Sequence, residues 1–177
     1  MTYTSEYVSP LGTILLAAAE DALIGLWFIG QRYFGRGLPP DAVPGGAPPL
    51  AEAARWLDVY FSGREPEFMP PLRCGSTPFS AVVSDIMREI PYGHTVSYGE
   101  IAAEAAKRLG VPRMSAQAVG GAVGRNPISI LIPCHRVVGA NGSLTGYGGG
   151  IGRKLWLLKS EGVDVRGRNI SRSGTAF

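Results

Sequence analysis

The residues best suited to covalent chemistry lie together at 133–137, which reads Pro-Cys-His-Arg-Val. The apolar, β-branched character of 130–138 predicts a buried strand that presents a thiol at its mouth. A thiol reacts as the thiolate, and a neighbouring base or positive charge lowers its pKa from about 8.5. His135 is the nearest base, and Arg136 is the nearest positive charge. Cys134 is therefore a candidate nucleophile, with a buried structural cysteine as the alternative.

A catalytic Cys-His pair also needs the right geometry and a third group. Adjacent side chains on an extended segment point in opposite directions, so a bend after Pro133 is required to bring His135 to the sulfur. A carboxylate usually orients the base in such a relay. Glu161, near the end of the last helical pattern, is the candidate. From these residues alone, the choice between catalysis and a structural cysteine stays open.

The N-terminal part of the chain has the pattern of a small α+β unit. Short alternating apolar bursts between residues 3 and 29 predict two or three antiparallel strands with tight turns. The stretch 35–49 is crowded with Gly and Pro, which predicts an exposed loop. Residues 50–61 have a helical period, and Gly63 is expected to end that helix.

The C-terminal part is helical in texture from Thr77 onward. Ser97 and Glu100 have the spacing of a capping box, which predicts the start of a helix. A break at 110–112 separates it from a second helix at about 114–123. Helix, tight turn and helix form a DNA-binding signature, although a plain helical hairpin fits the spacing equally well.

Small residues dominate the second of these helices. Gly120 and Gly121 each weaken a helix by about 1 kcal/mol relative to alanine, so a thin surface must be useful there. Close packing on protein and close approach to nucleic acid both explain it. The glycine-rich stretch 146–150 lacks the Lys-Ser/Thr ending of a phosphate-binding loop, which excludes a nucleotide site of that kind. A last helix is expected at 153–162, followed by a frayed tail at 166–177.

Composition limits the other classes of function. The 177 residues carry a formal net charge of +3, which permits nucleic acid as a partner but equally fits a solvated basic surface. Two cysteines and two histidines cannot supply a structural zinc site, so no metal is expected. No apolar run approaches the about 20 residues that span a bilayer, and no signal peptide is evident. We expect a cytoplasmic protein without membrane association, whose reducing surroundings disfavour a Cys74–Cys134 disulfide.

Four motifs in order resemble one protein family. They are Gly-Arg-Asn-Pro-Ile at 124–128, Pro-Cys-His-Arg-Val at 133–137, Gly-Tyr-Gly-Gly at 146–149 and Leu-Leu-Lys-Ser-Glu-Gly at 157–162. Together they resemble the O6-alkylguanine-DNA alkyltransferases, also called methylated-DNA–protein-cysteine methyltransferases. The similarity runs almost without gaps from about residue 77 to residue 162.

The resemblance implies a fold of the α+β class in two domains. A ribonuclease H-like α/β domain with its connector is expected at 1–70, and a winged helix-turn-helix-like domain with the tail at 71–177. It also implies DNA repair without a cofactor or a required protein partner. An alkyl group would pass irreversibly from O6-alkylguanine, and from O4-alkylthymine, in double-stranded DNA to Cys134, once per protein molecule. The damaged base would be rotated out of the stack, and the second helix would enter the minor groove.

Carried over position by position, the resemblance implies the following roles. Cys134 is the nucleophile, His135 removes its proton through a water, and Glu161 holds the imidazolium. Tyr98 supplies a proton to the departing base, and Asn126 braces the turn before the reactive stretch. Residues expected at the DNA or the flipped base are Ser115, Gln117, Ala118, Gly120, Gly121, Arg125, Val137, Tyr147 and Gly148, and Arg136 is expected to tie the two domains together.

One position departs from the family pattern. Relatives usually have an arginine where this chain has Gln117, which is shorter and uncharged. We therefore expect weakened base flipping and DNA affinity. Three other functions remain to be separated from repair: a DNA-binding protein that flags alkylated bases without repairing them, a cysteine hydrolase and a transcriptional adaptor.

Overall fold

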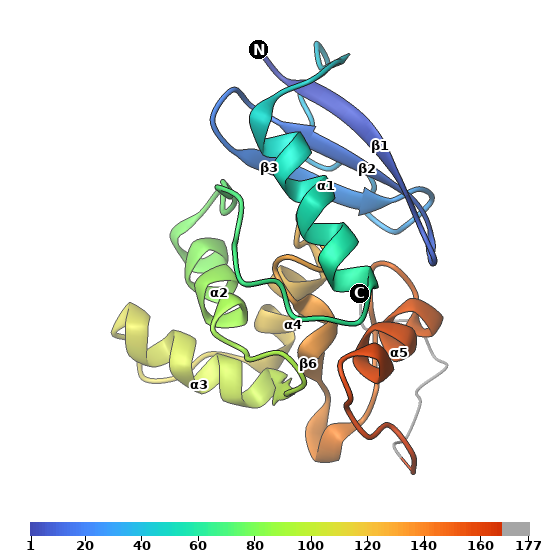
Figure 1. The fold of residues 1–177 in the computed structure, drawn as a ribbon. Helices are drawn as coiled ribbons and strands as arrows, with labels where there is room; N and C mark the ends of the chain where they lie inside the picture. Colours follow the sequence, from blue (N-terminus) through green and yellow to red (C-terminus); the bar gives the residue numbers. More distant parts are fainter. Residues whose placement is uncertain (168–177) are drawn as a thin grey trace. The chain divides into compact units, whose positions relative to one another are not determined.

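The computed structural model of the 177-residue chain describes residues 1–167 (Figure 1). Contacts divide the chain into two compact units. The first consists of Met1–Cys74 together with Pro127–Ser129, and the second of Gly75–Asn126 together with the chain from Ile130 onward. Each unit mixes helices with strands, so the α+β class expected from the sequence is confirmed.

The first unit is built on a four-stranded sheet in the order β3-β2-β1-β4. The strands are β1 (Tyr3–Ser9), β2 (Gly12–Ala18), β3 (Leu23–Phe28) and β4 (Val43–Pro44). The three long strands are antiparallel, as predicted. Strand β4 corrects the prediction of a loop throughout 35–49, because Val43 N donates to Thr2 O and Gly45 N to Thr4 O. The proline of this two-residue strand is tolerated because β4 is an edge strand.

Helix α1 (Pro48–Phe61) belongs to the same unit and begins two residues earlier than predicted. Its two leading prolines suit a first helical turn, where a backbone N–H has no intrahelical partner in any case. The helix buries one face, made of Leu50, Ala53, Trp56, Leu57 and Tyr60. The predicted stop is confirmed, because Gly63 has a φ of +83° directly after the C-cap Ser62.

A short segment from much later in the chain completes the first unit. Leu26 of β3 donates from its amide to Pro127 O at 2.8 Å, and Ser129 N donates to Leu26 O at 3.0 Å. Ile128, between them, is fully buried. The segment Pro127–Ser129 therefore extends the β3 edge of the sheet, only a few residues before Cys134.

The second unit is mainly helical. Its elements are α2 (Pro78–Arg88), β5 (Val96–Ser97), α3 (Tyr98–Leu109), α4 (Ala116–Gly124), the 3₁₀ turn η1 (Cys134–Arg136), β6 (Val137–Val138), the 3₁₀ turn η2 (Ala140–Gly142) and α5 (Ile151–Ser160). The predicted capping box is confirmed: Ser97 Oγ accepts from Glu100 N at 3.1 Å, and Glu100 Oε2 accepts from Ser97 N at 2.8 Å. Helix α3 packs against both α2 and α4, and the predicted helix, turn and helix are present.

The predicted buried strand at 130–138 is wrong for most of its length. Residues 129–132 turn, with Ile130 at a φ of +69°, and only Val137 and Val138 form a strand, which pairs in parallel with β5. The apolar run correctly indicated burial, because Ile130, Leu131 and Ile132 are all at most 2% exposed. A short apolar run does not distinguish a strand from a buried turn.

Two further expectations concern the ends of the chain and the membrane. The frayed tail expected at 166–177 lies mostly outside the described residues. Within residues 1–167, no helix is both long enough and apolar enough to cross a bilayer.

Candidate active site

Cys134 begins a tight 3₁₀ turn rather than ending a strand. Arg136 N donates to Pro133 O at 2.9 Å, and Val137 N donates to Cys134 O, so the chain bends directly after the proline. The bend that a Cys-His relay requires is therefore present. The sulfur belongs to a free cysteine that is 7% exposed.

The surroundings of Cys134 act on its pKa in opposite directions. Burial raises the pKa of the thiol and is the dominant influence. A hydrogen bond from the Asn126 side chain, the positive charge of Lys154 and the amides of Cys134 and His135 act to lower it. The resting cysteine is therefore a buried thiol, in a site that already contains the groups that stabilise its anion.

His135 and Glu161 form a fully buried hydrogen bond. The imidazole Nε2 lies 2.7 Å from Glu161 Oε1, and both side chains are 0% exposed. Burial lowers the pKa of His135, although the carboxylate opposes this effect, so the imidazole is neutral at pH 7. With the Nε2 proton directed to Glu161, Nδ1 is the basic atom of the ring. The pair can thus accept a proton and stabilise the imidazolium that results.

Arg136 holds the same carboxylate from another side. Its Nε donates to Glu161 Oε2 at 2.9 Å, its Nη2 to Glu161 Oε1 at 3.1 Å, and its Nη1 to Ile90 O at 2.7 Å. Burial acts to raise the pKa of Glu161, but the hydrogen bonds and charges of His135 and Arg136 prevail and lower it to about 2. These contacts of Arg136 join segments of the second unit, and its expected role in tying the two domains together stays a prediction.

Tyr98 and Asn126 complete the predicted catalytic set around the thiol. Tyr98 Oη donates to Thr145 O at 3.5 Å, and burial, with a contribution from the charge of Cys134, raises the pKa of this phenol. Asn126 Nδ2 donates to Ile132 O at 2.9 Å, across the turn that leads to Cys134. All five residues predicted to be catalytic lie in the second unit, with Tyr98, Asn126 and His135 interacting directly with the thiol or its immediate surroundings.

Lys154 is a member of this group that the sequence analysis missed. It lies on α5, is 0% exposed, and interacts electrostatically with Cys134. Lysines are rarely buried, so its residue type pointed to the surface. Its position offered a signal, because Leu157 and Leu158, three and four residues later on the same helix face, are fully buried.

The residues predicted to contact DNA lie mainly on α4. Ser115, Gln117, Ala118 and Arg125 are exposed, Gly121 is half-buried and Gly120 is buried. Ser115 is the N-cap, and its Oγ accepts from Ala118 N at 2.9 Å. The guanidinium of Arg125 folds back along the helix, since a Cβ placed on Gly121 would lie 3.2 Å from Arg125 Nη2.

The remaining predicted residues lie in segments beside the 3₁₀ turn. Val137 is fully buried and follows it directly, and its carbonyl accepts a hydrogen bond from Lys154 Nζ. Tyr147 and Gly148 are half-buried in the loop before α5. Among residues 1–167, no three His, Cys, Asp or Glu side chains gather in a way that could hold a metal ion.

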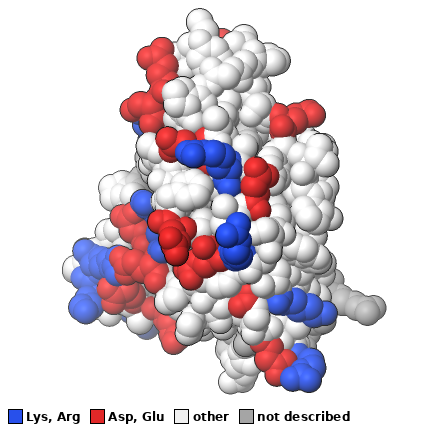
Figure 2. Space-filling view, viewed as in Figure 1, with Lys and Arg blue, Asp and Glu red and all other residues white. Residues whose placement is uncertain are grey.

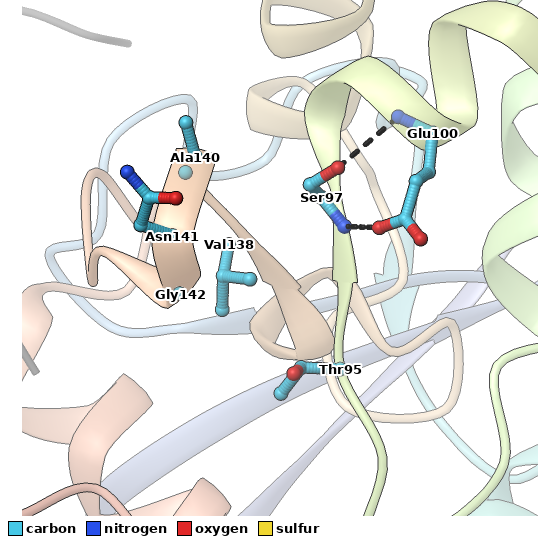
Figure 3. Close-up of a pocket in the computed structure, with 8 residues that line it drawn as sticks. Thr95, Ser97, Glu100, Val138, Ala140, Asn141 and Gly142 are labelled. Carbon is cyan, nitrogen blue, oxygen red and sulfur yellow. Dashed lines mark hydrogen bonds between the residues drawn. The ribbon is translucent and has the colours of Figure 1, made fainter.

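A surface hollow of about 660 Å³ lies elsewhere in the second unit. It is lined by Thr95, Ser97, Glu100, Val138, Gly139, Ala140, Asn141 and Gly142. Figure 3 shows the hydrogen-bonded Ser97 and Glu100 on one side and Val138, Ala140 and Asn141 on the other. None of the predicted site residues lines this hollow, and the side chains of Ser97 and Glu100 each accept a hydrogen bond from the other residue's backbone amide.

On one face of the molecule, the charged side chains do not mark out a DNA-binding region. On the face shown in Figure 2, acidic and basic side chains are interspersed. Arg108 of α3 pairs with Glu89 at 2.7 Å and with Glu104 at 2.8 Å. Such exposed pairs contribute little to stability.

Comparisons with known proteins agree with this geometry. Residues 2–74 match the ribonuclease-like domain of the 6-O-methylguanine DNA methyltransferase family, and residues 78–163 match its DNA binding domain. A methylated-DNA–protein-cysteine methyltransferase of Methanosarcina acetivorans is 44% identical over 161 residues, which cover 90% of this chain and 98% of that protein. The corresponding protein of Mycobacterium leprae is 45% identical over 165 residues, 91% of this chain and 93% of that protein.

A solved structure is similar over most of the chain as well. The crystal structure of Mycobacterium tuberculosis OGT in complex with DNA matches with a TM-score of 0.79 and 42% sequence identity. The match covers 90% of this chain and 93% of that one.

Proposed function

Because the chain belongs to the 6-O-methylguanine DNA methyltransferase family, we propose that it repairs DNA by transferring an alkyl group from O6-alkylguanine to its own Cys134. The observation that carries this proposal is the buried arrangement of Cys134 beside the His135–Glu161 pair. It provides a nucleophile, a neutral base and a carboxylate that orients the base.

The proposed reaction begins with the thiol proton. His135 accepts it through a water, and Glu161 stabilises the resulting imidazolium. The sulfur then forms a bond to the alkyl carbon while the bond between that carbon and O6 breaks, and the electron pair of the broken bond stays with the guanine. Tyr98 supplies a proton to the departing base, and the proton taken up by His135 then restores the phenol, so that in net terms the sulfur gains the alkyl group and the guanine gains a proton. A thioether is a poor leaving group, so each molecule reacts once.

The target base must reach the thiol of Cys134, a residue that is only 7% exposed. We propose that the guanine is rotated out of double-stranded DNA, which costs a few kcal/mol and least for a damaged pair. Helix α4 would enter the minor groove, where its small residues allow a close approach. Asn126 would brace the turn beneath the thiol, Val137 O would accept from the guanine amino group, and Tyr147 and Gly148 would cover the base.

The same chemistry extends to a second substrate and suits a reducing compartment. O4-alkylthymine offers the same kind of alkyl-oxygen bond and would be a second substrate. The reaction uses only side chains of the protein, so no cofactor or protein partner takes part in it. We place it in the cytoplasm, where a reducing environment keeps Cys134 as a thiol.

One experiment tests the proposal directly. The protein is incubated with a duplex that contains one O6-methylguanine, and the peptides are analysed by mass spectrometry. We expect one methyl group on the Cys134 peptide and unmodified guanine in the DNA. Cys134→Ser should form no adduct, and Cys74→Ser should react as the native protein does.

The other outcomes identify the alternatives. DNA binding without an adduct would indicate a protein that only flags alkylated bases. Repeated release of product would indicate a hydrolase. Strong preference for an undamaged sequence would indicate a transcriptional adaptor. Each of these three results would overturn the proposal.

A further inference from the structure

Lys154 is a buried ammonium whose hydrogen-bonding capacity is fully used. Its Nζ donates to Val137 O, to Thr145 O at 3.0 Å and to Gly146 O at 3.1 Å. An ammonium has three donors, and here each meets a backbone carbonyl. Burying a cation is costly unless it is hydrogen-bonded and compensated by charge, so a fully buried lysine needs a reason.

The three carbonyls come from the two segments that flank the reactive cysteine. Val137 follows the 3₁₀ turn of Cys134 directly, whereas Thr145 and Gly146 lead into the loop of Tyr147. Thr145 O also accepts from Tyr98. One ammonium therefore connects the backbone beyond the thiol, the approach to the loop and the phenol.

The anion that would compensate Lys154 is the thiolate of Cys134. Burial lowers the pKa of Lys154 to about 8, and the charge of Cys134 opposes this effect. In return, the charge of Lys154 acts to lower the pKa of Cys134. His135 and Tyr98 are the other titratable groups coupled to the pair, and Glu161 is already engaged by His135 and Arg136.

We propose that Lys154 is a positioning residue for alkyl transfer, which fastens the backbone on both sides of the reactive cysteine and serves as the counterion of its thiolate. The role of Lys154 in alkyl transfer rests on the proposed function. The coupling between ammonium and thiol is a property of the protein alone.

Two substitutions separate the parts of this role. Lys154→Met keeps an unbranched side chain of similar length but removes the charge and all three donors. Lys154→Arg keeps the charge, but a planar guanidinium cannot direct donors to three carbonyls that surround one point. Lys159→Met is the matched control, because Lys159 is an exposed residue of the same helix.

The first measurement is the titration of the thiolate, followed by its rate of alkylation with iodoacetamide between pH 6 and pH 10.5, in the full-length protein without DNA. A Cys74→Ala background leaves Cys134 as the only cysteine, since the chain has two. We expect Lys154→Met to shift the titration upward by about one pH unit or more, which is a tenfold loss of thiolate at a fixed lower pH. Lys154→Arg and Lys159→Met should titrate close to the native protein.

The second measurement is the rate of methyl transfer to Cys134 at pH 7.5. We expect a loss of at least tenfold for Lys154→Met and a smaller loss for Lys154→Arg, whose thiol ionises normally but whose backbone is less well held. Thermal unfolding by circular dichroism establishes that each variant is folded. If Lys154→Met does not fold, Lys154→Arg decides, since a native transfer rate in that variant would overturn the positioning role.

An unchanged titration and an unchanged transfer rate in folded Lys154→Met would overturn the whole inference. Failure of the proposed function would appear differently. The native protein would then form no adduct, while the thiol titration would still respond to Lys154.

Discussion

Glu161 is the residue on which the buried charges of the site depend. Its carboxylate lies within hydrogen-bond distance of His135 Nε2, Arg136 Nε and Nη2, and the amide of Gly93. Removing one partner of a buried ion pair leaves the other charge uncompensated, which is far more damaging than losing an exposed pair. The network therefore holds the His135 imidazole in place and stabilises the fold at the same time.

We expect Glu161→Gln to lower the free energy of unfolding by about 3 kcal/mol and to slow methyl transfer at least a hundredfold, because Arg136 loses its counterion and His135 its orienting group. Urea denaturation at pH 7 and the rate of adduct formation measure the two effects. Glu89→Gln is the control, since Glu89 is an exposed carboxylate that pairs with Arg108. Equal urea midpoints for Glu161→Gln and the native protein would contradict the prediction.

The same carboxylate predicts a dependence of stability on pH. The pKa of Glu161 in the folded protein is about 2, below its ordinary value of 4.5. A lowered pKa stabilises the fold above pH 4.5, and this contribution is lost as the pH falls from 4.5 toward 2. The difference in urea midpoint between the native protein and Glu161→Gln should therefore shrink over that range. A difference that stays constant from pH 7 to pH 3 would show that ionisation of Glu161 is not its source.

Gln117 is the residue at which the chain departs from the family pattern. The side chain is exposed on α4, where a longer, charged residue could fill the space left by a flipped base more fully. We expect Gln117→Arg to accelerate repair of duplex O6-methylguanine several-fold and to leave single-stranded substrate unaffected. Gln117→Lys adds a positive charge without a planar guanidinium, so it separates the effect of charge from the effect of guanidinium shape. Equal repair rates for the native protein and Gln117→Arg would mean that Gln117 does not limit flipping.

Helix α4 combines a thin surface with a folded-back cation. Gly121 leaves room for the guanidinium of Arg125, which lies close to where a Cβ would be. Glycine weakens a helix, so this arrangement lowers the stability of α4 but gives it a thinner surface. If α4 enters the minor groove, the thinner surface allows a closer approach to DNA.

We expect Gly121→Ala to raise the free energy of unfolding by up to about 1 kcal/mol while it weakens DNA affinity several-fold. The added methyl group moves the Arg125 guanidinium and thickens the helix face. Gly152→Ala is the matched control, because Gly152 lies in α5 and a methyl group added there would have no neighbouring atom within 4 Å. It should stabilise the protein without changing affinity for duplex DNA. Unchanged affinity in Gly121→Ala would argue against a close approach of α4 to DNA.

Local sequence signals predicted the elements well, and long-range packing explains the errors. The capping box of Ser97 and Glu100 and the stop at Gly63 depend on neighbouring residues, and both are present. Strand β4 pairs with β1, and Ser129 at the start of the 129–132 turn donates to Leu26 O of β3, so residue type alone could not reveal these long-range contacts. Lys154 was missed for the same reason, because its three carbonyl partners become neighbours only in the fold.

At the scale of the whole molecule, the first unit depends on residues that come more than fifty positions after its main segment. Ile128 is fully buried in that unit, beside strand β3. We expect Ile128→Ala to lower the free energy of unfolding by about 2–4 kcal/mol, because truncating a buried side chain leaves a cavity. Denaturation in urea measures this. Val8→Ala is the comparison, since Val8 is 82% exposed on β1, and a similar loss in both variants would refute the packing argument.

The chain passes between its two units three times, at 74–75, 126–127 and 129–130. A single recombination point therefore cannot exchange one unit for that of a relative. A chimera joined at residue 74 would pair a foreign sheet with the resident Pro127–Ser129, and its β3 edge would meet a segment selected against a different surface. Shuffling of this protein in evolution or in the laboratory has to carry those three residues along with the first unit.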